Sequence, residues 1–199
     1  MTTFEQQIKD IWRLRVPFDT VYTSVFLIKT ETDMILVDCA TTADDVDTYI
    51  VPALSQLGIS LQEVGTIVLT HRHTDHAGGL TRILDHAPNI EVVSDIRTLC
   101  DKISTYPMAG HTADCIGVLD KRTGTLISGD GLQGAGVDKY RCSLKAPEAY
   151  LETLLRIDID QDIQNILFSH AYEPWYKDFA LGRDKVKQCL EDCKAYVKI

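Results

Sequence analysis

The feature that most constrains this chain is a run of metal-ligand side chains directly after a buried strand. The apolar residues 66–69 precede the sequence Thr-His-Arg-His-Thr-Asp-His, which occupies residues 70–76. Imidazole and carboxylate are the usual ligands of zinc and similar borderline metals. In extended backbone His71 and His73 point to the same side, and a turn into a following helix can bring the last two ligands to a second point. One short segment can therefore serve two adjacent metal ions.

The glycine pair Gly78-Gly79 follows this segment at the start of an expected helix. Glycine has no Cβ, so the pair lets the backbone pass close to a metal centre. The competing interpretation is a polar loop that happens to be rich in histidine. Four of the six positions from residue 71 to residue 76 are potential ligands, which favours the metal site.

The pattern His-x-His-x-Asp-His resembles that of the metallo-β-lactamase superfamily, and three later segments resemble the family's other ligand loops. Residues 107–112 are similar to its glycine-histidine-threonine segment, residues 126–130 to its strand that ends in Gly-Asp, and residues 167–170 to its last strand, which ends in a histidine. By this resemblance three side chains hold each metal and one carboxylate joins the two metals. The first set is His71, His73 and His111, the second set is Asp75, His76 and His170, and the bridging residue is Asp130.

The resemblance implies an α/β (α+β) fold, the four-layer αβ/βα sandwich with two central sheets and helices outside. At 199 residues the chain is expected to form a single domain over residues 1–199. Strands are expected at Ile11–Val16, Val21–Ile28, Met34–Val37, 66–69, Ile90–Ser94, on both sides of the turn 121–124, and at Asn165–Phe168. Helices are expected at Thr42–Leu57, Gly79–His86, Ala146–Ile157 and Arg183–Val197, with a helical turn in Asp95–Asp101.

Some details within these helices are specific enough to be tested. Pro52 conflicts with an unbroken helix over Thr42–Leu57, so we expect a kink or a restart there. His86 is expected to be a solvated helix residue and not a ligand. The leucines expected to face inward from the third helix are Leu151, Leu154 and Leu155.

Composition and charge narrow the class of partner. A net charge of −9 argues against duplex nucleic acid and against anionic membrane surfaces, because both are bound through lysine and arginine. The first residues do not combine a basic stretch with a following apolar stretch, so we do not expect a signal peptide. No apolar run approaches the length of a membrane span. Six cysteines without tight pair spacing indicate reduced thiols. We therefore expect a cytoplasmic protein that acts on a small-molecule substrate.

The expected chemistry follows from two neighbouring cations. Two metals about 3.5–4 Å apart can share a water, lower its pKa and present hydroxide as the nucleophile. This predicts a metal-dependent hydrolase whose bridging hydroxide cleaves a small ester, thioester or lactone. Zinc is the first expectation for both ions, and iron or manganese also suit this ligand set. Asp130 would bridge the ions, while Asp75 would orient the hydroxide and later donate a proton to the leaving group.

The resemblance favours the glyoxalase II-like branch of the superfamily. The zinc β-lactamases commonly carry a cysteine where this chain has Asp130, whereas glyoxalase II and the lactonases use a bridging aspartate. In glyoxalase II a lysine nine residues after that aspartate helps to hold glutathione, and Lys139 has this spacing. Arg141 stands in place of an expected tyrosine. Lys139 and Arg141 are therefore candidate substrate-binding residues, with an exposed polar loop as the competing interpretation.

Further candidates lie near the end of the chain and behind the metals. Tyr172, Trp175 and Tyr176 either form an aromatic wall beside the substrate or pack against the C-terminal helix. Asp38 either caps the next turn or, as the resemblance implies, orients ligands from behind the metals. The resemblance implies a longer interval than the 35 residues from His76 to His111, so we expect a more open mouth, or one that another subunit closes in a homo-oligomer.

Two other functional classes compete with the hydrolase. The persulfide dioxygenases of the same superfamily resemble this motif but use two histidines and the aspartate on one iron. A mononuclear iron persulfide dioxygenase-like oxidoreductase is therefore the main alternative. A non-catalytic descendant that keeps the metals for structure or partner contact is the third class. Metal content per chain, oxygen uptake with glutathione persulfide and turnover of esters separate the three.

Overall fold

The computed structural model describes residues 2–132, 144–172 and 177–197. These residues form two compact units, Met1–Ser94 (unit 1) and Asp95–Ile199 (unit 2). Each unit is built on one six-stranded sheet. Within the described ranges, no helix combines the length and the apolar character needed to cross a membrane. The single domain expected over residues 1–199 stays a prediction.

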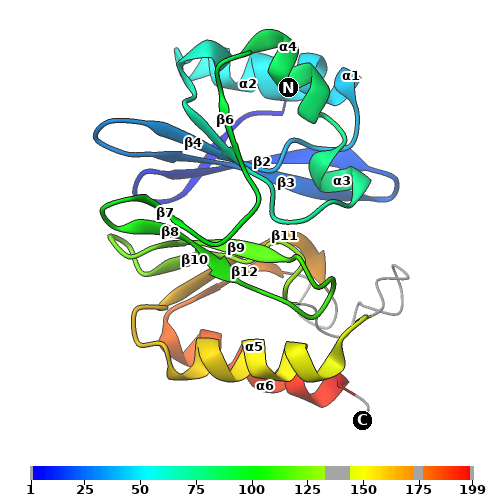
Figure 1. The fold of residues 1–199 in the computed structure, drawn as a ribbon, viewed down its shortest axis with the longest axis vertical. Helices are drawn as coiled ribbons and strands as arrows, with labels where there is room; N and C mark the ends of the chain where they lie inside the picture. Colours follow the sequence, from blue (N-terminus) through cyan, green and yellow to red (C-terminus); the bar gives the residue numbers. More distant parts are fainter. Residues whose placement is uncertain (1, 133–143, 173–176, 198–199) are drawn as a thin grey trace. The chain divides into compact units, whose positions relative to one another are not determined.

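The sheet of unit 1 runs in chain order and changes from antiparallel to parallel halfway across. Its strands are β1 (Glu5–Ile8), β2 (Ile11–Phe18), β3 (Val21–Lys29), β4 (Met34–Val37), β5 (Thr66–Val68) and β6 (Glu91–Val93). Pairing is antiparallel up to β4 and parallel from β4 to β6. The helical connections are α1 (Ala43–Asp45), η1 (Val46–Ile50), α2 (Val51–Gln56), η2 (Leu61–Glu63), α3 (Thr74–Ala77) and α4 (Leu80–His86). Figure 1 shows α2 and α4 on the same face of this sheet, where they close its apolar core.

The helix expected over Thr42–Leu57 is present in three consecutive pieces. Thr42 begins it with a reciprocal cap: the Thr42 hydroxyl accepts from the Asp45 amide (3.1 Å), and the Asp45 carboxylate accepts from the Thr42 amide (2.9 Å). A π-helical turn, η1, then precedes α2. Pro52 lies in the first turn of α2, where its missing N–H is not needed. The expected restart at Pro52 is confirmed.

The sheet of unit 2 is an antiparallel meander with one parallel pair. Its strands are β7 (Thr98–Cys100), β8 (Ile103–Pro107), β9 (Ile116–Asp120), β10 (Thr125–Ile127), β11 (Asn165–Tyr172) and β12 (Lys177–Leu181). Only β10 and β11 are parallel, and α5 (Pro147–Ile159) lies in the connection between them. The last helix, α6, spans Arg183–Tyr196. Figure 1 shows α5 and α6 together on one face of this sheet.

Two expectations about the strands of unit 2 are wrong. Asp95–Asp101 is not a helical turn; it contains β7, in which Thr98 pairs with Ser104 of β8. Seven residues are too few to show a helical period, and pairing with β8 decides the conformation. The strand predicted at Asn165–Phe168 is longer than expected and is not the last one, because β12 follows it as an antiparallel partner.

The orientation of α5 also differs in part from the expectation. Leu154 is fully buried as predicted and Leu151 packs at the edge of the core, but Leu155 is 57% exposed. Adjacent helical residues point about 100° apart, so Leu154 and Leu155 cannot both face inward. Tyr150 and Ile157, both fully buried, complete the inner face of α5.

Candidate metal centre

The ligand-type side chains of unit 1 lie beyond the carboxyl end of β5, the edge where open α/β sheets bind ligands. His71 lies in the connection and His73 directly precedes α3. Asp75 and His76 follow in α3 itself. His71 and His76 are buried, whereas His73 and Asp75 are partly exposed. The expected helix start at Gly79 is only part of the outcome: a short additional helix, α3, begins earlier, at Thr74, and carries Asp75 and His76.

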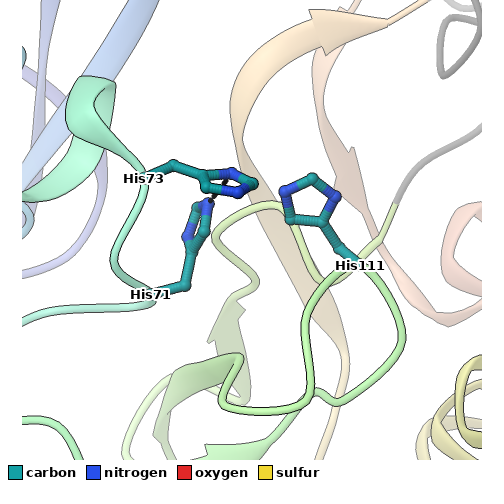
Figure 2. Close-up of side chains that lie close together, drawn as sticks. All are labelled: His71, His73 and His111. Carbon is teal, nitrogen blue, oxygen red and sulfur yellow. Dashed lines mark hydrogen bonds between the residues drawn. The ribbon is translucent and has the colours of Figure 1, made fainter. Parts of the chain in front are cut away.

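Two pairs of atoms in this segment have the spacing of donors that share one ion. His71 Nε2 lies 3.1 Å from His73 Nδ1, and Figure 2 shows the two rings on the chain between β5 and α3. His76 Nε2 lies 3.3 Å from Asp75 Oδ2. Two donors at zinc bond length, about 2.0–2.1 Å, are about 3.3 Å apart in tetrahedral geometry. Unit 1 thus presents one imidazole pair and one imidazole–carboxylate pair.

Asp38, at the end of β4, holds two of these histidines from behind. Its carboxylate accepts from the Thr70 amide (2.8 Å), the Thr70 hydroxyl (2.8 Å) and His76 Nδ1 (2.7 Å). The Thr70 hydroxyl also lies 3.2 Å from His71 Nδ1. These contacts occupy Nδ1 of both rings and turn Nε2 toward the neighbouring ligand-type side chain. Asp38 therefore orients the histidines, while the next turn is capped by Thr42.

The turn that carries Asp38 is strained and tightly packed. Asp38 and Ala40 have φ values of 63° and 60°, in the left-handed region that costs a residue with a Cβ about 1–2 kcal/mol. A Cβ added to Gly78 or Gly79 would lie 1.8 or 2.1 Å from a carbonyl oxygen of residues 39–41. We expected the glycine pair to allow a close approach to the metals. The close approach that the structure shows is to the backbone of this turn.

Unit 2 supplies three further ligand-type side chains from three separate segments. His111 lies in the loop after β8, where Figure 2 labels it, Asp130 follows β10, and His170 lies in β11. His111 is 1% exposed, Asp130 2% and His170 7%. Gly129 has φ of 54° directly before Asp130, and the pairing of β11 with β12 is irregular between residues 167 and 172. Such local departures from regular strands redirect side chains.

The two carboxylate oxygens of Asp130 face different histidines. Oδ1 lies 3.4 Å from His170 Nε2, and Oδ2 lies 3.8 Å from His111 Nε2. A carboxylate with one oxygen toward each of two imidazoles has the arrangement of a bridging ligand. Within each unit, imidazole and carboxylate atoms at these separations are of the ligand types that bind zinc and similar divalent metals.

Two described thiols close to these side chains in the sequence, Cys39 and Cys115, make hydrogen bonds of their own. Cys39 Sγ donates to the carbonyl of His76 (3.2 Å), and Cys115 Sγ lies 3.0 Å from the Thr112 hydroxyl. Burial raises the pKa of the Cys115 thiol to about 11 and raises the pKa of the Cys39 thiol well above its usual range. Both thiols are therefore protonated at neutral pH, whereas a metal ligand or nucleophile must be the thiolate.

Two threonines that hold ligand segments were missed in the sequence. Thr70 directly precedes His71, and Thr112 directly follows His111, where its hydroxyl donates to Asp114 Oδ1 (2.7 Å) and ties the loop together. The available signal was their position next to a ligand, because ligands are usually oriented by hydrogen-bonding neighbours.

The candidate substrate contacts are not tested by the structure. Lys139, Arg141 and their neighbour Tyr140 lie outside the described residues, as do Trp175 and Tyr176; of Tyr172 only the backbone is described. His86, which we expected not to be a ligand, lies on the surface of α4 and contacts Asp47 (Nε2 to Oδ1, 2.7 Å).

Comparison with solved structures shows the fold. The metallo-beta-lactamase FIM-1 of Pseudomonas aeruginosa, solved in a mono-zinc form, superposes with a TM-score of 0.74 at 17% identity, covering 100% of this chain and 97% of that one. A metallo-beta-lactamase of Erythrobacter litoralis gives 0.71 at 20% identity, with 96% of each chain covered. The predicted αβ/βα sandwich class is confirmed. Residues 18–99 also match the sequence model of the metallo-beta-lactamase superfamily. This sequence match and the shared fold support the resemblance to that superfamily.

The chain also resembles two curated proteins. Hydroxyacylglutathione hydrolase of Pectobacterium atrosepticum is 26% identical over 166 residues, which cover 70% of this chain and 65% of that protein. The uncharacterized protein YobT of Bacillus subtilis is 26% identical over 170 residues, covering 65% of this chain and 70% of YobT. The chain thus spans slightly less than two thirds of the length of the hydroxyacylglutathione hydrolases that it matches.

Proposed function

We propose that this protein is a metal-dependent hydrolase of the metallo-beta-lactamase type, which cleaves a small ester, thioester or lactone with the help of two divalent ions, zinc being the first expectation. The proposal joins ligands from both units. The ligands assigned to one ion are His71, His73 and His111, those assigned to the other are Asp75, His76 and His170, and Asp130 is shared.

The observation that carries this proposal is the orientation of Asp130. Its two oxygens lie 3.4 Å from His170 and 3.8 Å from His111, one histidine from each assigned set. Asp130 is only 2% exposed, so an ionised carboxylate here needs positive partners, and imidazoles that hold cations provide that environment. In a site with a single metal ion, one of the two Asp130 oxygens would have no metal to bind.

The chain's own residues position the ligands and handle a proton. When bound, two cations supply a water of lowered pKa and positive charge beside the bond that breaks. Asp38 and Thr70 orient the rings of His76 and His71 so that each Nε2 remains available. Asp75, whose side chain is 16% exposed, is the assigned carboxylate with access to solvent, and we assign it the proton transfer to the leaving group.

Three observations support a small ester or thioester as the substrate. Asp130 stands where the zinc β-lactamases commonly carry a cysteine, so antibiotic hydrolysis is not proposed. The hydroxyacylglutathione hydrolases that the chain resembles are named for the hydrolysis of an acyl-glutathione. The net charge of −9 disfavours nucleic acid and anionic membranes. We also propose that the protein acts in the cytoplasm; a homo-oligomer stays a prediction.

Elemental analysis of protein purified without added metal, coupled to a substrate screen, tests the proposal. We expect two divalent ions per chain, hydrolysis of at least one thioester, lactone or aryl ester, loss of turnover with a chelator and its return with zinc. One iron per chain together with oxygen uptake on glutathione persulfide would overturn the hydrolase in favour of the dioxygenase. Two bound ions with no turnover on the whole screen would instead support a non-catalytic protein.

A further inference from the structure

Helix α5 and the residue before it bind the segment that leads from β8 to His111. The backbone carbonyls of residues 107, 109 and 110 in this segment each accept a hydrogen bond from that part of the chain. The bonds run from Arg156 Nη1 to the oxygen of Pro107 (3.2 Å), from the Thr153 hydroxyl to that of Ala109 (2.8 Å) and from the Ala146 amide to that of Gly110 (3.1 Å). The backbone immediately before the ligand is thus held along its length.

Helix α5 packs so closely against this segment at Gly110 that a side chain would not fit between them. A Cβ added to Gly110 would lie 2.7 Å from the Cβ of Tyr150, and Gly110 has φ of 149°, a conformation that favours glycine. Tyr150 is fully buried on the inner face of α5. A shift of α5 would therefore move the backbone next to His111.

The same segment also contacts the residue that follows Asp130. A Cβ added to Gly131 would lie 2.5 Å from the Cβ of Met108, and the Met108 amide donates to the carbonyl of Cys115 (3.0 Å). Two of the three ligand-type residues of unit 2, His111 and Asp130, thus adjoin the backbone that α5 holds.

Thr153 is the residue of α5 whose chemistry is not explained by core packing. It is 1% exposed, and valine has nearly the same shape without a polar group that needs a partner. Its hydroxyl instead donates to Ala109, two residues before His111. Deleting the donor would leave a carbonyl that lacks a partner, and a buried polar group without a partner is costly.

We propose that Thr153 is a positioning residue for His111, and that α5 through this bond sets how tightly the ion assigned to His71, His73 and His111 is held. This inference rests on the proposed function, since it presupposes that ion. Thr153 touches neither the ion nor the substrate. Its effect reaches the ligand through the backbone of residues 109–111.

The test measures zinc affinity by competition with a chromophoric chelator, and the visible spectrum of the cobalt(II) form, in four variants. Thr153→Val should raise the Kd of one of the two ions about tenfold, the lower end of what outer hydrogen-bond partners contribute, and should alter the cobalt spectrum. Thr153→Ser keeps the hydroxyl and should stay close to wild type. Arg156→Met, at a partly exposed position, should give a smaller rise of about threefold.

The matched control is Ile157→Val, which trims a fully buried core side chain of the same helix. It should lower the melting temperature without changing either Kd. Equal shifts of Kd in Thr153→Val and Ile157→Val, or unchanged affinity in both Thr153→Val and Arg156→Met, would overturn the inference. If Thr153→Val does not fold, Thr153→Ser and Arg156→Met against Ile157→Val decide the question in the same way.

A His111→Ala variant separates failure of this inference from failure of the proposed function. Loss of one ion in His111→Ala with no change in the α5 variants would refute the role of α5 alone. Two ions still bound with wild-type affinity in His111→Ala would refute the ligand assignment itself, and with it the role of α5.

Discussion

The two units present their ligand-type side chains in contrasting ways. Unit 1 offers four of them within residues 71–76, and hydrogen bonds that converge on Asp38 hold two of these, His76 directly and His71 through Thr70. Unit 2 offers three that are up to 59 residues apart in the chain, held by a left-handed glycine, an irregular strand pair and the backbone contacts of α5. A contiguous ligand segment can depend on one buried carboxylate. Dispersed ligands depend on how well the whole unit is folded.

The largest expected effect is that of Asp130→Ala, which removes the residue where the dispersed ligands meet. We expect loss of bound metal and a fall in kcat/KM of more than about a hundredfold, because even outer partners of metal ligands contribute about 10- to 100-fold. Circular dichroism should show that the fold is kept. Elemental analysis and steady-state kinetics measure the change, and full activity in this variant would refute the bridging role.

Asp38→Asn tests whether unit 1 depends on a single carboxylate. Asparagine tolerates the φ of 63° at this position, so the variant removes the charge and one acceptor oxygen and leaves the backbone unstrained. We expect zinc affinity to fall about 10- to 100-fold, more than in Thr153→Val. Competition with a chelator gives both values. A smaller effect at Asp38 than at Thr153 would break the contrast between the units.

Asp33→Asn is the matched control for Asp38→Asn within unit 1. The Asp33 carboxylate also connects strand ends, since it accepts from the amides of Met34 and Gly65 and from the hydroxyl of Thr66. None of these partners is an assigned ligand. Asp33→Asn should lower thermal stability while metal affinity stays at the wild-type value.

A moderate effect on stability is expected from Arg183→Met in unit 2. The Arg183 guanidinium, 15% exposed, donates to backbone carbonyls in and just after the last turn of α5, at residues 157, 158, 160 and 163. Losing these bonds should lower the free energy of unfolding by about 1–2 kcal/mol. Urea denaturation measures it, with Lys187→Met on the exposed side of α6 as control. Equal stability of the two variants would contradict this anchoring of α5.

The smallest expected effect belongs to Asp47, on the surface of unit 1. Hydrogen bonds from the Arg82 guanidinium, and then from the His86 imidazole, hold the pKa of the Asp47 carboxyl below its ordinary value of 3.8. A depressed pKa in the folded state stabilises the protein above the ordinary value, and this gain is lost as the pH falls through the folded value. Asp47→Asn should therefore melt slightly lower than wild type at pH 7, and the difference should shrink and then vanish as the pH falls below the ordinary value of 3.8.

Metal binding should not depend on the hydrogen bonds that Asp47 makes with Arg82 and His86. His86→Ala removes the imidazole partner of Asp47 on α4 and should leave the metal content unchanged. A large loss of bound metal in this variant would show that the ligands of unit 1 are misassigned.

The contrast between the units also explains what could be predicted from the sequence. In unit 1 the helix interrupted near Pro52 and the strands around the ligand segment follow from local patterns. The strand pattern places Asp38 at a strand end, but its role beside the ligands was expected only from the family resemblance. The reciprocal contacts of Asp38 with Thr70 and His76 could not be derived, because they join residues more than 30 positions apart.

Unit 2 was harder to predict because its short strands do not carry the usual alternation. In β12 the buried residues are Asp178 and Ala180, while Phe179 and Leu181 are exposed, so an apolar-inside pattern does not reveal the strand. The three residues of β7 are in strand conformation because they pair with β8, and not because of a local sequence pattern. The hold of α5 on the segment before His111 depends on Thr153, which is 42 residues further along the chain.

The packing of Gly78 and Gly79 against residues 39–41 has a consequence for experiments that score every substitution. Any side chain at either position would collide with a carbonyl oxygen, so these two positions should be as intolerant of change as the histidines beside them. A mutational map of this chain would therefore rank two residues without a functional group among its most essential. Intolerance of substitution near a metal centre therefore reports close backbone packing as well as direct metal binding.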